Sequence, residues 1–266
     1  MAYGGYGGGY GGSGGRPRRR FQPDQRTLII VVVGVALIAI LLRTHRISSA
    51  NIIYFCVLIP SIIFHEVSHG VVALAFGDDT AKRAGRVTLN PVKHVDPVGT
   101  LLVPAVLSLA GIGAYGWAKP VPVSPNRLRS PRNHTVIVSL VGPVTNFALA
   151  AVLGLALVWT TPQIILVQVS YYWSHGYSAY PPSLLGEILF LAGVANIVLG
   201  VFNCIPCPPL DGAAVLERFL PDRMLPQYYN LQPFLMFLPL ILILLFRNQW
   251  SELISHIISW WAGLLV

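Results

Sequence analysis

Long apolar runs with few charged side chains recur along the chain, and they constrain its fold more than any other feature. Six runs share this character: residues 27–42, 52–76, 135–159, 184–206, 232–246 and 250–266. About 20 consecutive helical residues cross a hydrocarbon core of about 30 Å. Lipid offers the backbone no hydrogen-bond partners, so spanning runs of this kind are expected to be helices. The sequence therefore predicts an α-helical, multi-span membrane protein with about five to six transmembrane helices.

The composition and the positions of the basic residues agree with a membrane location. Of the 266 residues, 54% are hydrophobic and 11% are charged, whereas a typical soluble domain carries about 25% charged residues. The net charge of +8 could suggest a nucleic-acid partner. However, Lys and Arg gather before the first apolar run and in the loops at 82–93 and 119–132, as in cytoplasmic loops. We expect a lipid bilayer and no nucleic acid as the partner.

The Lys and Arg distribution also predicts an orientation. Arginines before residue 27 place the N-terminus in the cytoplasm, and the basic loops 77–98 and 119–133 are then cytoplasmic as well. Residues 99–117 between these loops must enter and leave on one side, and Pro104 with several glycines suits such a re-entrant element. The chain is thus expected to be multi-pass, with both basic loops on the cytoplasmic side.

The domain organisation is simple. Residues 1–26 are Gly/Tyr-rich and then basic, cannot bury enough apolar surface to fold, and are predicted to be a disordered tail without a cleavable signal peptide. Residues 27–266 are expected to form one membrane-embedded domain with its core at 52–220. The alternating residues 86–89, together with residues 119–123, predict short β-strands near the cytoplasmic face.

The segment His65-Glu66-Val67-Ser68-His69 carries the clearest chemistry. On a helix, His65 and His69 share one face about one turn apart, so both imidazoles can reach one zinc ion. Glu66 is offset, and it would reach a water molecule on the metal and take its proton. Because His and Glu are costly inside an apolar run, a catalytic role is favoured over a chance occurrence of this motif.

Two histidines need a third protein ligand to hold zinc. The candidates in the sequence are His45, His94, Asp96, Asp211 and His256. Asp211 follows the run 184–206, and the loop-charge argument brings it to the cytoplasmic membrane face that His65 and His69 approach. A second role stays open, because an Asp followed by Gly212 and small apolar residues is also typical of a helix N-cap.

The sequence has three cysteines, too few for a disulfide framework. Cys204 and Cys207 have the spacing of a redox or zinc-binding pair, but the surrounding prolines and the nearby Asp211 favour a packing role.

Taken together, the motifs resemble the site-2 protease family of intramembrane zinc metalloproteases, in its short form without a PDZ or CBS domain. They are Phe64-His65-Glu66-Val67-Ser68-His69-Gly70, Gly142-Pro143-Val144-Thr145-Asn146, and Phe202-Asn203-Cys204-Ile205-Pro206 with Pro209-Leu210-Asp211-Gly212. The resemblance covers about residues 52–220. One departure is that Cys204, not proline, follows Asn203.

This resemblance implies roles for individual residues. It implies that His65, His69 and Asp211 bind one zinc ion per chain and that Glu66 is the catalytic base. It also suggests that Asn146 steadies the substrate or the oxyanion. For Asn146 a structural hydrogen bond between helices remains an equal alternative.

The expected function is that of a zinc metalloendopeptidase that hydrolyses peptide bonds in or near transmembrane segments of membrane-protein substrates. A substrate helix would have to unwind, and the extended strand could pair with residues 86–89 or 119–123. Two alternatives are a metal or proton transporter and a catalytically inactive membrane scaffold. A transporter would need a polar path across the bilayer, yet the acidic groups cluster near one face, and a scaffold would not need all four site residues.

Overall fold

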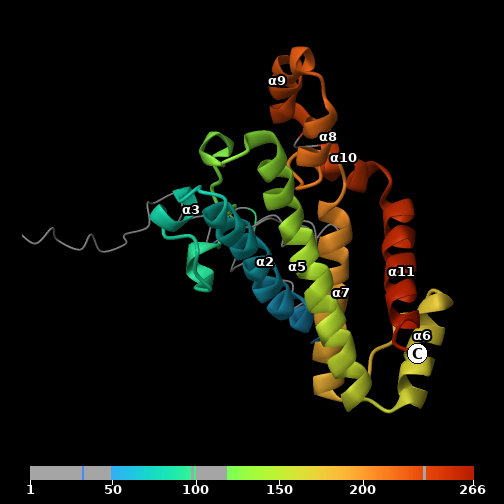
Figure 1. Ribbon diagram of the computed structural model, residues 1–266. Coiled ribbons are helices and arrows are strands. Elements are labelled where there is room, and N and C mark those ends of the chain that lie inside the picture. Colours follow the sequence, from blue (N-terminus) through green and yellow to red (C-terminus); the bar gives the residue numbers. More distant parts are fainter. Residues whose placement is uncertain (1–31, 33–48, 97–98, 100–118, 236–237) are drawn as a thin grey trace, which may run out of the picture.

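Three long helices form the frame of the protein. The computed structural model describes residues 32, 49–96, 99, 119–235 and 238–266, and within these residues the regular structure is helical, with no strand. Helices α2 (Ser49–Ala75), α5 (Pro131–Thr160) and α7 (Leu184–Asn203) lie side by side (Figure 1). Among the described residues they are the three helices long and apolar enough to cross a membrane.

These helices correspond to the spans expected at 52–76, 135–159 and 184–206. They contain 27, 30 and 20 residues, and a rise of about 1.5 Å per residue makes each at least about 30 Å long. That length matches the hydrocarbon core of a bilayer. The expectation of a helical membrane protein is therefore confirmed.

Two other apolar runs are covered by shorter helices within the described residues. The run 232–246 contains the end of α9 (Leu225–Leu235) and α10 (Leu238–Leu245), and residues 236–237 between them lie outside the described residues. Residues 250–266 lie mostly in α11 (Arg247–Gly263), which has 17 residues and carries polar groups on one face. The expected tail 1–26, nearly all of the run 27–42 and nearly all of the re-entrant segment 99–117 fall outside the described residues.

The short strands expected at 86–89 and 119–123 are absent from these segments. Residues 87–88 form a bend, and residues 86, 89 and 119–124 have no regular secondary structure. Pro120 and Pro122 have no N–H group, and the Val121 N–H is bound to a carboxylate of α2. Backbone donors that a strand ladder needs are therefore missing or already used.

Two shorter helices cover one side of the frame. Helix α6 (Gln163–Ser174) packs against α11, and α11 packs against α7 (Figure 1). The buried Trp261 of α11 lies against Phe190 and directly over Gly193 of α7. Any side chain at Gly193 would overlap the indole ring, so this glycine lets the two helices approach closely.

The C-terminal ends of α2 and α7 and the start of α5 meet at one end of the frame, near α3 (Thr80–Arg83) and α8 (Ala213–Phe219) (Figure 1). Buried Asp78 fastens the 119–130 segment there, because its carboxylate accepts the N–H groups of Thr80 at 3.0 Å and Ser124 at 2.6 Å. Burial alone would raise the pKa of Asp78, but these hydrogen bonds and the charge of Arg127 outweigh it and hold that pKa below its ordinary value.

Candidate metal centre

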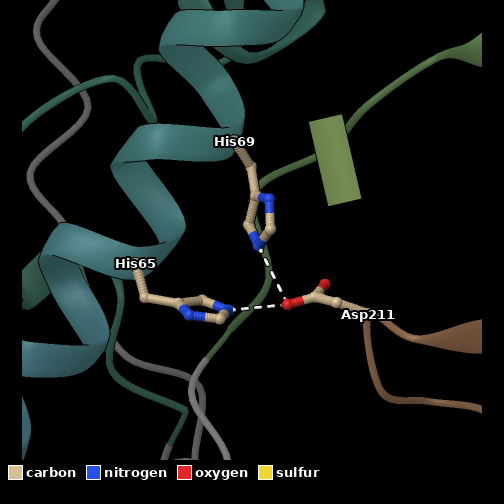
Figure 2. A group of neighbouring side chains, drawn as sticks. All are labelled: His65, His69 and Asp211. Atoms are coloured by element: carbon tan, nitrogen blue, oxygen red, sulfur yellow. Dashed lines mark ion pairs between the residues drawn. The ribbon is translucent and has the colours of Figure 1, made fainter. Parts of the chain in front are cut away.

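His65 and His69 point from α2 towards Asp211, which follows α7 (Figure 2). Both histidines are buried, and their rings lie edge to face with centroids 4.7 Å apart. Asp211 Oδ2 is 2.9 Å from His65 Nε2 and 3.4 Å from His69 Nε2. Within the described residues this is the group of three His, Cys, Asp or Glu side chains close enough to share a metal ion. The structure thus brings together the three residues predicted as ligands.

A tight turn after α7 positions Asp211. The N–H of Gly212 donates to the carbonyl of Asn203 at 2.7 Å. Gly212 has an ordinary helical φ of −58°, but a Cβ atom there would collide with the backbone carbonyls of Cys204 and Ile205. The glycine is therefore required for close approach of the backbone. Helix α8 has Gly212 as its N-cap without a side-chain capping bond, so Asp211 does not cap α8.

The second ring nitrogen of each histidine faces a hydrogen-bond acceptor. His69 Nδ1 lies 2.6 Å from the carbonyl oxygen of Val138, and His65 Nδ1 lies 2.6 Å from Oδ1 of Asn146. A carbonyl oxygen only accepts, so Nδ1 must carry the proton and donate it. In a neutral imidazole Nε2 then has a free lone pair. Both lone pairs face Asp211.

This arrangement fits a zinc ion. With both imidazoles neutral, two bare nitrogens face Asp211 Oδ2, a buried oxygen without a further hydrogen-bond partner. A metal ion between these three atoms would offset their mutual repulsion. Zinc binds His nitrogen and carboxylate oxygen at about 2.0–2.2 Å, which places the ligand atoms of a tetrahedral site about 3.3 Å apart. The observed separations of 2.9 and 3.4 Å bracket that spacing.

Asn146 lies behind His65 and is fully buried. Its Nδ2 donates to Oδ1 of Asn196 at 2.8 Å, and its Oδ1 accepts from His65. Of the two roles that the sequence left open, these contacts correspond to hydrogen bonds between helices. They connect α5 to α2 and α7.

Glu66 is half-buried and lies next to His65 in α2. The backbone N–H of Val121 donates to Glu66 Oε2 at 2.7 Å. Val121 is itself buried in the 119–123 segment, which Asp78 fastens to the end of α2. The carboxylate of Glu66 is therefore held by the backbone through Oε2.

Gly142 of α5 has a role at the site that was not predicted from the sequence. A Cβ atom at this position would lie 2.6 Å from Cε1 of His65 and 2.6 Å from both Cε1 and Nε2 of His69. Only glycine lets α5 approach both imidazoles, so the Gly142-Pro143 pair was the available signal. Asn196 was also missed, although an amide in a long apolar run is itself a signal. No sequence signal could have indicated the Val138 carbonyl, since every residue has a backbone carbonyl.

Two other histidines proposed as the third ligand lie away from this group. His94 is buried, and its Nε2 donates to the carbonyl of Thr88 at 2.8 Å. His256 is exposed on α11 beside Glu252. Neither belongs to the metal-binding group found among the described residues, and His45 lies outside those residues.

Cys204 and Cys207 are free thiols near the turn. Burial raises the pKa of the Cys207 thiol, which disfavours thiolate chemistry there.

Comparison with known proteins agrees with this site. Residues 53–246 match peptidase family M50. The protein named "Putative zinc metalloprotease YwhC" of Bacillus subtilis is 39% identical over 164 residues, which cover 62% of this chain and 67% of that relative. The protein named "Putative zinc metalloprotease Rip2" of Mycolicibacterium smegmatis is 31% identical over 211 residues, covering 76% of this chain and 73% of that relative. No solved structure gives a significant match. The chain belongs to peptidase family M50, the site-2 protease family, and is a membrane zinc metalloprotease.

Proposed function

We propose that this chain is an intramembrane endopeptidase in which His65, His69 and Asp211 hold the one zinc ion and Glu66 is the general base. The observation that carries the proposal is the convergence of two imidazole Nε2 atoms, at 2.9 and 3.4 Å, on one buried carboxylate oxygen of Asp211. Such an N, N, O donor set is typical of catalytic zinc sites, which keep a further position open.

The side chains divide the chemistry between them. When bound, zinc supplies Lewis acidity that polarises a peptide carbonyl and lowers the pKa of water. Glu66 takes the proton of the attacking water and later gives it to the leaving amine. Because Val121 N–H occupies Oε2, Oε1 is the atom that carries this proton. Asn146 acts through His65, since it is fully buried.

We propose that the substrates are transmembrane segments cleaved near the cytoplasmic face. The site lies near the end of the frame where the basic residues of the 82–93 and 119–132 loops gather, whereas residues 160–183 at the other end contain no Lys, Arg, Asp or Glu. Positive loops favour the cytoplasm. We further propose five to six crossings, a cytoplasmic N-terminus and a re-entrant 99–117 segment.

Glu66→Gln provides the test of this mechanism. This variant is expected to keep its zinc, measured by elemental analysis, and to lose cleavage while retaining substrate. Membrane peptides that co-purify with it, identified by mass spectrometry, would name the substrate class. The matched control is Glu252→Gln, because Glu252 is an exposed acidic residue on α11. Full cleavage by Glu66→Gln would refute the assignment of the base.

Asp211→Ala tests the metal site separately. Loss of the carboxylate leaves only two protein ligands, so the purified variant is expected to contain far less zinc. Retention of one zinc ion per chain would move the third ligand to another residue.

A further inference from the structure

Buried polar side chains connect the three long helices behind the metal centre. Ser61 of α2, Asn146 of α5 and Asn196 of α7 are 4%, 0% and 1% exposed. An amide or hydroxyl in such a place is costly unless it is hydrogen-bonded. The partners of these side chains lie within the group, in nearby backbone or, for Asn146 Oδ1, at His65. The pattern of donors and acceptors is therefore fixed.

The direction of these bonds is set at Asn196. Its Nδ2 donates to the carbonyl of Ala192 at 2.9 Å and to Oγ of Ser61 at 2.9 Å. The Ala192 carbonyl can only accept, so the amide of Asn196 cannot be reversed. The Ser61 hydroxyl donates its proton to the carbonyl of Val57 at 2.8 Å, so its oxygen can only accept from Asn196. Oδ1 of Asn196 is thus left to face Asn146.

The orientation of the Asn146 amide in turn determines which atom faces His65. Since Asn196 offers an oxygen, Asn146 must turn its Nδ2 towards it and its Oδ1 towards Nδ1 of His65. A reversed Asn146 would offer N–H to His65 Nδ1. The imidazole would then carry its proton on Nε2, where it would point at Asp211 and block metal binding.

The two histidines differ in this respect. His69 donates to a backbone carbonyl, that of Val138, and a peptide group held in a helix does not reverse. His65 depends on a side-chain amide, which can rotate about its own bond. Only His65 therefore needs a second residue to keep its acceptor in place.

We propose that Asn196 is a positioning residue that locks the amide of Asn146 and so keeps His65 in its metal-binding tautomer. This inference rests on the proposed function, in which His65 is a zinc ligand. Partners that orient a ligating histidine typically change metal affinity by about 10- to 100-fold when they are removed.

Zinc affinity of the purified full-length chain, measured by competition with a chelator, gives the test. Asn196→Leu removes the acceptor for Asn146 at similar volume and is expected to weaken zinc binding about 10- to 100-fold. Asn196→Asp keeps a carbonyl oxygen for Asn146, and as a protonated acid it also keeps one donor for Ala192. This conservative variant is expected to restore affinity close to that of the unaltered chain. Equal losses in both variants would overturn the proposal.

A control and a ligand variant separate the explanations. Phe190→Leu alters a fully buried residue of the same helix outside the polar group, so it is expected to lower stability without changing zinc affinity. His65→Gln must lose zinc. If it does not, the proposed metal site is wrong. If it loses zinc while Asn196→Leu binds like the unaltered chain, only the positioning role of Asn196 is refuted.

A spectroscopic measurement does not depend on any Asn196 variant being stable. In zinc-loaded, ¹⁵N-histidine-labelled protein with assigned His65 signals, Nδ1 is expected to carry the proton and Nε2 to show the shift of a metal-bound nitrogen. A proton on Nε2 of His65 would overturn the proposal.

Discussion

Gly142→Ala is expected to disrupt the metal centre by adding a single methyl group. The new Cβ would lie 2.6 Å from ring atoms of both His65 and His69, whereas carbon atoms in contact are separated by about 3.5 Å or more. An overlap of about 0.9 Å must therefore be relieved. Each imidazole is already tied by a 2.6 Å hydrogen bond at Nδ1, so either the rings tilt or α5 moves away.

The magnitude follows from the cost of overpacking. Extra methyl groups in a packed core cost about 1–3 kcal/mol. If this cost destabilises the arrangement that binds zinc, zinc affinity falls roughly 5- to 150-fold, because each factor of ten in affinity corresponds to about 1.4 kcal/mol. Cleavage should fall by about 100-fold when the ligands shift by about 1 Å. The assay is zinc competition by the purified chain, together with cleavage of a membrane-embedded reporter substrate.

Gly154→Ala is the matched control. Gly154 lies on the same helix, and a Cβ atom there would approach the end of the Leu265 side chain at 2.9 Å, away from the metal centre. That variant is expected to bind zinc normally. If Gly142→Ala also binds zinc normally and cleaves at the unaltered rate, the close approach of α5 to the imidazoles does not determine the site.

Three further results are expected. Val121→Pro removes the N–H that orients Glu66, so cleavage should fall roughly tenfold or more while the zinc content stays constant; unchanged cleavage would contradict this role. Asp78→Asn should destabilise the protein by about 1–3 kcal/mol at neutral pH. The pKa of Asp78 is held below its ordinary 3.8. The difference in unfolding free energy between Asp78→Asn and the unaltered chain, measured by denaturant unfolding, should therefore persist above about pH 4 and shrink as the pH falls through the folded-state pKa. A difference independent of pH would contradict this role of Asp78. Removing zinc with a chelator should abolish cleavage, and adding zinc back should restore it.

The sequence predicted the long spans because hydrophobic length is a local property. It did not predict the structure of residues 119–123. These residues were expected to pair as a strand, but their prolines and the Val121–Glu66 bond leave no ladder. Local composition does not reveal which partner a segment meets.

By itself the sequence determined that this chain enters a membrane. It also determined that His65 and His69 lie on one helix face, because spacing and hydropathy are local properties of neighbouring residues. Loop charges even brought Asp211 to the same face. Only the tertiary structure decided how the site is held. The acceptors behind His65 and His69, the direction of the Asn146 amide and the need for Gly142 arise where α2, α5 and α7 touch. Contacts between segments that lie far apart in the chain leave no local pattern, because a backbone carbonyl or a missing Cβ acquires its meaning only from what packs against it.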